Sequence, residues 1–488
     1  DGLRYSWRDL ERASAMMANL FAALGVPQGA RIVAQVDKSV EAMMLYLAAL
    51  RGGHVFVPLN SAYQRAELEY FIADAVPEVV VCTRANAAWI EPILRAAQPQ
   101  SAHLFTLDAD RTGSLLEQAA QCSDRHAVAP CRADDLASII YTSGTTGRSK
   151  GAMLTHSNLL SNAQVLKDYW GWRSPAQGGD VLIHALPIFH VHGLFVAIHG
   201  ALLNGSKMIW LSRFDPRTVI ARLPEATVFM GVPTLYVRML AEPALDRAAA
   251  RRMRLFISGS APLLLETFNT WRERTGHTIL ERYGMSETVM LTSNPYHPAQ
   301  GERRGGTVGF PLPGVQLRVR DEQGGDCATG EIGDIQVRGP NVFSGYWRMP
   351  EKTQEAFTAD GYFKTGDVGQ IDAQGYVTIV GRSKDLIISG GLNVYPAEVE
   401  GYLNEIEGVA ESAVIGVPHP DFGEVGVALV VARPGAALDG DALLATLKSK
   451  LAHFKVPKRC FIVAELPRNT MGKVQKALLR ERHQALFE

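Results

Sequence analysis

Cysteine is scarce in this sequence, and neither sign of charge dominates. The five cysteines are odd in number, scattered along the chain and without a CxxC pair. This usage indicates reduced thiols and a cytosolic compartment, and it argues against a cysteine-ligated zinc site. The 49 basic and 50 acidic residues leave a formal net charge of −1. No basic field therefore predicts binding to nucleic acid or to an anionic membrane.

Long apolar runs and internal repeats are missing as well. The sequence contains no window of 18 uncharged apolar residues, so no membrane span is predicted. The opening "DGLRYSWRDL" has no signal-peptide pattern. Hydrophobic residues make up 47% and charged residues 20% of the chain, which is typical of a soluble globular protein. The length of 488 residues exceeds one ordinary core and predicts two or three domains.

Short apolar runs alternate with helical patterns over residues 5–210, as in the helical "SVEAMMLYLAALRGG" followed by the strand-like "HVFVPLN". This alternation predicts a parallel sheet with helices on its faces. A second run contains "ATVFMGVPT", "MRLFISGSAP" and "HTILERYGMSE", each an apolar strand leading into a Gly-rich or polar turn. In open α/β sheets, ligands bind at such carboxyl ends of strands.

The texture changes after about residue 306, where short alternating strands predict a small β-barrel or antiparallel subdomain. The last hundred residues mix helical and strand patterns in a compact α+β unit. The predicted fold class is α/β. It comprises a large N-terminal domain of two α/β sheets plus the small barrel, over residues 1–383, and a small α+β C-terminal domain over residues 384–488.

The polar stretch "YTSGTTGRSKGAM", residues 141–153, predicts a phosphate site. It is not the ATPase pattern G-x-x-x-x-G-K-[ST], because Ser149 precedes Lys150 and Gly151 follows it. Its glycines still let backbone N–H groups converge on an anion, and its hydroxyls add donors. A surface turn is the alternative, but the strand "LASIIYT" before the stretch and the helical pattern from Asn158 after it favour an anion site. The residues expected to bind phosphate are Thr142, Ser143, Gly144, Thr145, Thr146, Gly147 and Lys150.

This stretch resembles the signature loop of the acyl-adenylate-forming superfamily, which includes acyl-CoA synthetases, luciferases and peptide-synthetase adenylation domains. Four further stretches fit the superfamily in the same order along the chain: "YGMSET" at 283–288, "TGD" at 365–367, "GRSKD" at 381–385 and "PRNTMGKV" at 467–474. In detail, "GPNVFSGYWRMPEKT" and "LPRNTMGKVQK" resemble the malonyl-CoA synthetase branch. The resemblance implies ATP and CoA as co-substrates and Mg²⁺ as cofactor. An acid attacks the α-phosphorus of ATP, and the CoA thiol then displaces AMP.

The resemblance also implies the nucleotide-binding residues. Glu287 would hold Mg²⁺, which prefers a carboxylate oxygen, and Ser286 would contact the α-phosphate. Asp367 would bind the ribose hydroxyls together with Arg382. The purely structural alternatives are a helix N-cap for Ser286 and an ordinary turn for Asp367. The remaining predicted nucleotide-site residues are Ser260, Ala261, Glu281, Tyr283 and Gly284.

Lys473 matches the adenylation lysine of the superfamily, whose ammonium reaches the reacting carboxylate and the α-phosphate together. Without the resemblance, a lysine in a Gly turn reads as a solvated charge. Its place in the C-terminal domain implies that this domain closes for adenylation and rotates about the hinge at Lys384 for thioester formation. Gly390 and Gly391 would then line the CoA channel. His190 matches the acyl-pocket position; a metal bound by His190 and His192 is the weaker interpretation, and His192 is given no role.

Arg282 carries the prediction of the acid. An arginine at the end of an apolar strand either points to solvent, pairs with Glu281, or binds a second carboxylate on the substrate with its guanidinium fork. The last interpretation fits malonate better than succinate, and the malonyl-CoA synthetases share this arginine. Acetate would leave the guanidinium unpaired, which predicts rejection by roughly 10⁴-fold. Rejecting one extra methyl group is worth only about 1–3 kcal/mol, so acceptance of methylmalonate stays open.

The predicted function is that of an AMP-forming malonyl-CoA synthetase acting in the cytoplasm on malonate, ATP and CoA, as a monomer or weak homodimer. Three alternatives remain open. The acid could be another short, aryl or medium-chain acid, or the product could be loaded onto a carrier protein. A catalytically silent nucleotide-binding protein is the third, against which the presence of Lys473, Glu287 and Lys150 argues.

Overall fold

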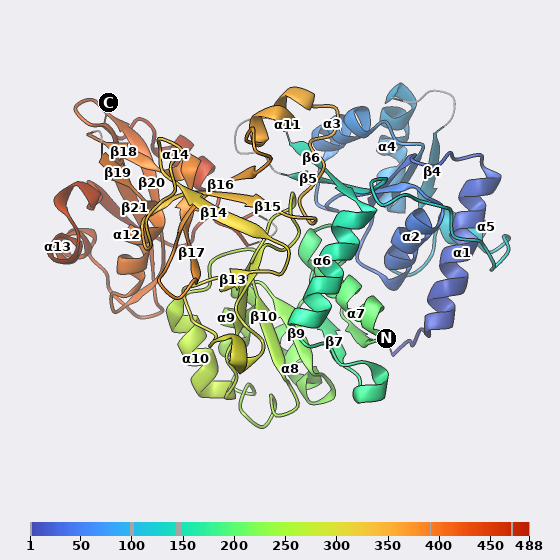
Figure 1. Cartoon of the computed structure of the whole chain (residues 1–488), viewed down its shortest axis with the longest axis horizontal. Helices are drawn as coiled ribbons and strands as arrows, with labels where there is room; N and C mark the ends of the chain where they lie inside the picture. The colour runs from blue at the N-terminus through green and yellow to red at the C-terminus, as the bar shows by residue number, and fades with distance from the viewer. Residues whose placement is uncertain (1, 98–101, 143–148, 391, 470–471, 488) are drawn as a thin grey trace. The chain divides into compact units, whose positions relative to one another are not determined.

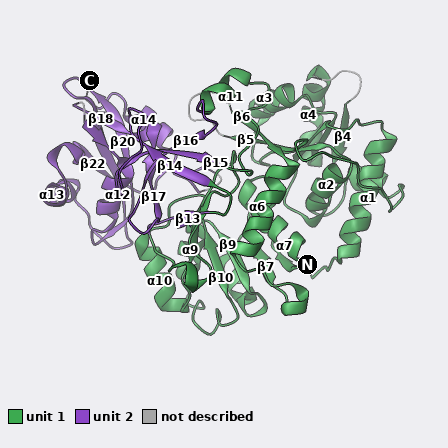
Figure 2. Ribbon diagram, viewed as in Figure 1, with its two compact units in different colours: residues 1–305, 312–315, 339–357 green, residues 306–311, 316–338, 358–488 purple. Residues whose placement is uncertain are grey.

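The computed structural model describes residues 2–97, 102–142, 149–390, 392–469 and 472–487. The chain forms two compact units, coloured separately in Figure 2. Unit 1 consists of residues 1–305, 312–315 and 339–357, and unit 2 consists of residues 306–311, 316–338 and 358–488. Each unit is described by itself below.

The first sheet of unit 1 has the strand order β4-β3-β1-β2-β5-β6. Its strands are β1 (Arg31–Gln35), β2 (Val55–Pro58), β3 (Val79–Cys82), β4 (His103–Thr106), β5 (Leu136–Thr142) and β6 (Lys150–Thr155). The helices of this region are α1 (Trp7–Ala23), α2 (Val40–Arg51), α3 (Arg65–Ala75), α4 (Arg84–Ala97) and α5 (Ser114–Ala119). The strand "VVVC" of β3 is buried along its whole length, as expected of a parallel strand covered on both faces.

The second sheet of unit 1 runs β12-β11-β10-β9-β7-β8 within that unit. Its strands are β7 (Val181–His184), β8 (Lys207–Trp210), β9 (Val228–Gly231), β10 (Leu255–Ser258), β11 (Leu280–Tyr283) and β12 (Thr292–Ser293). The accompanying helices are α6 (His156–Tyr169), the π-helix η2 (His192–Ile198), α7 (His199–Asn204), α8 (Pro216–Arg222), α9 (Pro233–Leu240) and α10 (Leu265–Thr275). Figure 1 shows α8, α9 and α10 close to these strands. Phe229, Tyr236, Phe256 and Trp271 join α9 and α10 to the sheet in one core cluster.

Unit 2 contains two further sheets. One is antiparallel, with the order β14-β15-β16-β17 for β14 (Gln316–Arg320), β15 (Gly333–Arg338), β16 (Phe363–Ile371) and β17 (Val377–Arg382). The other contains β18 (Ile387–Ser389), β19 (Leu392–Val394), β20 (Val409–His419), β21 (Gly423–Ala432) and β22 (Arg459–Val463). The helices of unit 2 are α12 (Pro396–Asn404), α13 (Gly440–Lys450) and α14 (Lys476–His483), whereas α11 (Pro350–Ala356) belongs to unit 1.

The predicted α/β class with two sheets in the large N-terminal part is confirmed, with two differences in detail. Both sheets are mixed and not purely parallel, because β6 and β12 pair antiparallel to β5 and β11. The predicted small barrel is an antiparallel sheet whose outer strands, β14 and β17, do not pair with each other in the described residues. The boundary at residues 383 and 384 stays a prediction.

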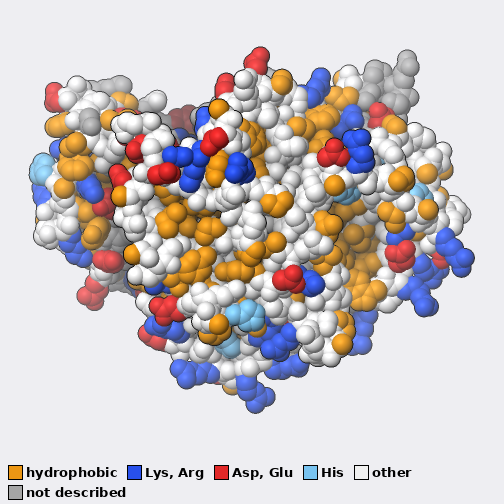
Figure 3. Space-filling view, in the orientation of Figure 1, with side chains coloured by type: hydrophobic (Ala, Val, Ile, Leu, Met, Phe, Trp, Pro, Cys, Tyr) orange, Lys and Arg blue, Asp and Glu red, His pale blue; other side chains and the backbone are white. Residues whose placement is uncertain are grey.

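None of the helices in the described part of the chain has the length and apolarity that crossing a membrane requires. Figure 3 shows acidic and basic side chains interspersed over the viewed face. That mixture agrees with a formal net charge of −1 and with the absence of a single-sign field on this face.

Candidate active site

The β5–β6 pair holds the two ends of the predicted phosphate loop. Thr142 and Lys150 face each other across these antiparallel strands, and the Thr142 hydroxyl donates to the Lys150 carbonyl over 3.4 Å. The predicted residues between them, Ser143, Gly144, Thr145, Thr146 and Gly147, lie outside the described residues. The sheet therefore places Lys150 at the mouth of the loop.

The expected local context of this loop is wrong in one respect. The sequence pattern predicted that the loop runs into a helix, but β6 intervenes and α6 begins only at His156. The segment "KGAMLT" is buried at Gly151, Ala152, Leu154 and Thr155, so it pairs with β5 instead of starting a helix. Any phosphate binding here must come from the loop's own N–H and hydroxyl groups and from Lys150, without a helix dipole directly behind the loop.

Tyr346 connects the predicted phosphate lysine to the predicted magnesium ligand. The Lys150 ammonium lies 4.5 Å from the centre of the Tyr346 ring, a cation–π distance. The Tyr346 hydroxyl donates to Glu287 Oε1 over 3.1 Å, and both of these side chains are buried. Sequence reasoning missed Tyr346, although it lies in the "GYW" of a stretch that carried the family resemblance.

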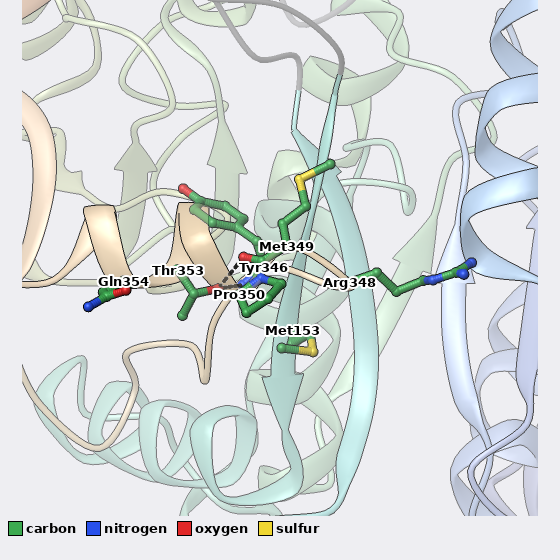
Figure 4. Close-up of a pocket in the computed structure, with 7 residues that line it drawn as sticks. All are labelled: Met153, Tyr346, Arg348, Met349, Pro350, Thr353 and Gln354. Atoms are coloured by element: carbon green, nitrogen blue, oxygen red, sulfur yellow. Dashed lines mark hydrogen bonds between the residues drawn. The ribbon is translucent and has the colours of Figure 1, made fainter.

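The backbone around Tyr346 is held on two sides. Trp347 N donates to Gly151 O over 2.8 Å, which lays this segment along β6. Tyr346 N donates to the Thr353 hydroxyl over 2.9 Å, and that hydroxyl donates to Met349 O over 2.9 Å. Figure 4 shows the contacts of Thr353 in an open pocket of about 460 Å³, with Arg348 directed away from the other side chains. The start of α11 thus fixes the ring that meets Lys150 and Glu287.

The turn after β11 presents Ser286 and Glu287. Gly284 is required there, because a Cβ at this position would lie 2.0 Å from the Val289 carbonyl oxygen. Residues 286–288 form a turn and no helix begins at Ser286, so the helix N-cap alternative is excluded. Glu287 is anchored through its carbonyl, which accepts from Phe343 N over 2.8 Å. The turn lies at the carboxyl end of β11, where ligands of such sheets bind.

Arg282 points into the protein, not to solvent. Its side chain is 2% exposed, and its Nε and Nη2 atoms have no hydrogen-bond partner among the described residues. The guanidinium lies flat against the backbone of Gly259, where a Cβ would come within 2.6 Å of Arg282 Cζ. Burial lowers the pKa of Arg282 to about 9, so the group stays charged at neutral pH. A buried cation with two open donors is arranged to bind an anion.

Glu281 is not the partner of Arg282. Neighbouring residues of a strand point to opposite faces of the sheet, and Glu281 Oε2 has no hydrogen-bond partner among the described residues. Glu281 Oε1 instead accepts from Leu263 N over 3.0 Å, which ties the turn after β10 to β11. Burial raises the pKa of Glu281 to about 8, so its carboxyl group is mostly protonated at neutral pH. Its predicted place in the nucleotide site stays a prediction.

His192 lies beside Ser260, within the electrostatic reach of Arg282. The Ser260 hydroxyl is 3.4 Å from His192 Nδ1, and Ser260 has a left-handed φ of 72°, a strained conformation for a residue other than glycine. Burial, reinforced by the positive charge of Arg282, holds the pKa of His192 well below its ordinary value. His192 begins the π-helix η2, and π-helices are frequent at functional sites.

Sequence reasoning gave His192 no role and chose His190, which lies just before η2 and accepts from Leu194 N through its carbonyl. The i, i+2 spacing of the two histidines was the available signal. Ala261, also a predicted site residue, directly follows Ser260 in the turn after β10.

The predicted residues of unit 2 form two groups. Asp367 and Arg382 face each other across β16 and β17, and Arg382 Nε pairs with Asp367 Oδ1 over 2.7 Å. Asp367 is 3% exposed, so it is not an ordinary surface turn residue. Lys473 is exposed and lies in a turn where its N–H donates to Asn469 Oδ1 over 3.0 Å.

The two remaining sequence-predicted positions of unit 2 lie near the start of its second sheet. Lys384 lies in a short 3₁₀ turn, and the next residue, Asp385, pairs with Arg480 over 2.9 Å. Gly390 has a left-handed φ of 58° and donates to Phe422 O over 2.9 Å. Gly391 lies outside the described residues.

Comparison with known protein families identifies the family to which this chain belongs. The model of the AMP-binding enzyme family matches residues 1–347, and the model of the AMP-binding enzyme C-terminal domain matches residues 398–473. The chain belongs to the AMP-binding enzyme family. The resemblance to the acyl-adenylate-forming superfamily and its AMP-forming acyl-CoA ligases, stated from five sequence stretches, is thereby confirmed.

Individual proteins with different acid substrates in their names are similar to nearly the whole chain. A malonate–CoA ligase of Arabidopsis thaliana is 35% identical over 99% of this chain and 85% of its own length. A feruloyl-CoA synthase of Amycolatopsis is 36% identical over 99% of this chain and 94% of its own length. The crystal structure of ATP-bound MatB from Rhodopseudomonas palustris is 52% identical, covers 100% of this chain and 95% of its own, and superposes with a TM-score of 0.96. The first two identities do not separate a dicarboxylic from an aryl acid, so the site itself must do so.

Proposed function

We propose that this AMP-binding enzyme is a malonyl-CoA synthetase that converts malonate, ATP and CoA into malonyl-CoA, AMP and pyrophosphate. Arg282 is the observation that carries the choice of acid, because it is a buried cation whose open Nε and Nη2 donors need an anion. The malonate–CoA ligase relative supports the same choice. A feruloyl group would offer this guanidinium no second carboxylate.

The reaction has two half-reactions. One carboxylate oxygen of malonate attacks the α-phosphorus of ATP, the bond to the bridging oxygen breaks, and pyrophosphate leaves. The CoA thiol then attacks the carbonyl carbon of malonyl-AMP, and AMP leaves with the electrons of the broken C–O bond. Because little covalent chemistry falls to the protein, its contribution is alignment and charge neutralisation.

The residues of unit 1 suit the phosphates. Lys150 supplies a positive charge at the mouth of the predicted loop, and Ser286 follows the turn at Gly284. Glu287 is a buried carboxylate that fits Mg²⁺, because Tyr346 orients one of its oxygens through a hydrogen bond. The described residues contain no group of three or more metal-binding side chains. Mg²⁺ would therefore take most of its ligands from phosphate and water, as is usual for this ion, and neutralise phosphate charge.

The position of Arg282 limits the length of the acid. Arg282 comes two residues before Gly284 and five before Glu287, so the anchored carboxylate lies near the turn that serves the phosphates. A single methylene between the two carboxylates suits this short span better than two. Ser260 and His192 add polar groups next to the guanidinium. The anchor provides specificity, because a monoacid leaves the buried cation unpaired.

The deciding experiment offers the pure protein ATP, Mg²⁺, CoA and one acid at a time: malonate, methylmalonate, succinate, acetate or ferulate. Mass spectrometry identifies the thioester, and nucleotide analysis separates AMP from ADP. We expect malonyl-CoA to dominate, with AMP and pyrophosphate as co-products. A monoacid thioester in excess would keep the adenylate chemistry and refute the dicarboxylate assignment. Adenylate formed without any thioester would support carrier-protein loading instead.

A further inference from the structure

Lys38 connects the two sheets of unit 1 at the carboxyl ends of their strands. It follows β1 of the first sheet by three residues, and its ammonium donates to two carbonyls of the second sheet region. The acceptors are His184 O at 2.8 Å and Leu211 O at 2.6 Å. The same ammonium lies 4.8 Å from the centre of the Trp210 ring. His184 and Trp210 are the last residues of β7 and β8, so Lys38 binds where both strands end.

His184 links Lys38 to the π-helix η2. Its ring stacks on Trp210 with centroids 4.7 Å apart, and its Nε2 lies 2.9 Å from Gly193 O. Burial, reinforced by the charge of Lys38, holds the pKa of His184 well below its ordinary value, so the ring is neutral and Nε2–H donates to that carbonyl. Gly193 is fixed from its other side, because a Cβ there would lie 1.9 Å from Pro187 O.

Gly193 directly follows His192 in the first turn of η2. His192 is 1% exposed and lies beside the Ser260 hydroxyl, and burial together with the charge of Arg282 depresses its pKa. A continuous series of contacts therefore runs from Lys38 through His184 and Gly193 to the side of the acid pocket. By contrast, Lys150 and Glu287, two of the groups assigned to the phosphates of ATP and to Mg²⁺, both contact Tyr346.

We propose that Lys38 is a positioning residue for the acid substrate, acting through His184 to hold the first turn of η2 and thereby His192 opposite Ser260 and Arg282. Lys38 itself does not touch the substrate. The inference rests on the proposed function, since it takes the surroundings of Arg282 as the acid site. It predicts a much larger effect on the acid than on ATP, because the series ends beside Arg282 and meets only Ser260 among the predicted nucleotide-site residues.

A purely structural role for Lys38 makes a different prediction. Removing a buried contact between two sheets would lower thermal stability and the amount of active enzyme, while leaving the KM of every substrate unchanged. Tyr46 offers the matched control. Its hydroxyl bonds to His199 Nε2 over 2.7 Å at the start of α7, directly after η2, so Tyr46→Phe removes a buried contact near η2 without touching the series from Lys38.

The experiment compares Lys38→Met, Lys38→Arg and Tyr46→Phe by steady-state kinetics with malonate and ATP varied in turn. For Lys38→Met we expect the KM of malonate to rise about tenfold or more, with the KM of ATP within about twofold of wild type. Lys38→Arg should recover part of the loss, since a guanidinium also donates to two carbonyls. Tyr46→Phe should lower the melting temperature and leave both KM values unchanged.

A second variant covers the case in which Lys38→Met does not fold. His184→Phe keeps a ring to stack on Trp210 and removes the donor to Gly193, so it should show the same selective rise in the KM of malonate. Unchanged KM values for malonate in the soluble variants, or equal rises for malonate and ATP, would overturn the inference. If the wild type makes no malonyl-CoA, the proposed function fails, and the same comparison is then made with the acid that the wild type does accept.

Discussion

At the scale of single residues, the position of Arg282 requires a glycine at position 259. A Cβ at Gly259 would lie 2.6 Å from both Cζ and Nη1 of Arg282, so an alanine there would collide with the guanidinium. We expect Gly259→Ala to displace the guanidinium and to lower kcat/KM for malonate by about 10- to 100-fold, the worth of one charge-assisted hydrogen bond. Initial-rate measurements with malonate and ATP varied separately would check this.

A matched glycine substitution provides the control for Gly259→Ala. Gly401 lies in α12 with no atom within 4 Å of a Cβ built there, so Gly401→Ala should leave the kinetics unchanged. It should also stabilise the protein slightly, because alanine favours a helix over glycine. Equal activity of Gly259→Ala and wild type would show that Arg282 does not need this close approach.

Glu281 makes stability depend on pH, and the sign follows from the direction of its shift. Burial raises its pKa from 4.5 to about 8, so between these values the folded state keeps a proton that the unfolded state has lost. Its contribution to the free energy of unfolding is complete below pH 4.5 and is lost as pH rises toward 8. We expect the free energy of unfolding of Glu281→Gln to fall less steeply with pH, by the slope that the release of about one proton contributes. Urea unfolding at pH 5, 6, 7 and 8 measures it, and parallel slopes for the two proteins would contradict it.

At the scale of elements, the segment along β6 links the phosphate and magnesium groups. Tyr346 both covers Lys150 with its ring and donates to Glu287 with its hydroxyl. Tyr346→Phe removes only the hydrogen bond, so we expect the Mg²⁺ concentration for half-maximal activity to rise about tenfold, as when a metal ligand loses its outer partner. Tyr346→Leu removes both contacts and should be worse.

The control for Tyr346→Phe is a tyrosine whose hydroxyl bonds elsewhere in the same unit. Tyr169 donates to Ser293 O over 3.3 Å, and Tyr169→Phe should leave the Mg²⁺ requirement unchanged. A Mg²⁺ titration that is identical for Tyr346→Phe and wild type would remove Tyr346 from the metal environment.

The elements also show where sequence reasoning reached its limit. Apolar runs such as "VVVC" predicted buried strands correctly, because burial on both faces leaves a local pattern. The strand at Lys150–Thr155 was missed because its pairing with β5 is a tertiary contact, and the local pattern there resembles a helix approach. Arg282 could be singled out from a charge at the end of an apolar strand. His192 and Tyr346 left only weak local signals, since their contacts are with Ser260 and Glu287, which are distant in sequence.

At the scale of the whole molecule, the proposed residues are divided between the two units. Arg282, Glu287 and Lys150 belong to unit 1, whereas Asp367, Arg382 and Lys473 belong to unit 2. The predicted boundary at residues 383 and 384 had instead placed Asp367 and Arg382 in the large domain, with only Lys473 of these three in the small one. The proposed reaction therefore draws on residues of both units.

Lys473 separates the two half-reactions. Its ammonium is proposed to stabilise the charge that develops during attack on the α-phosphorus, a step that thioester formation does not share. Lys473→Ala should therefore lower malonyl-AMP formation by about 10²- to 10³-fold, the cost of one aligned donor, while malonyl-CoA formation from supplied malonyl-AMP continues near the wild-type rate. Lys448, exposed on α13 of the same unit, gives the matched control Lys448→Ala, expected to leave both steps intact. Pyrophosphate release measures the first step and thioester formation measures the second. Loss of both steps in Lys473→Ala would indicate a structural role, and loss of neither would refute the assignment.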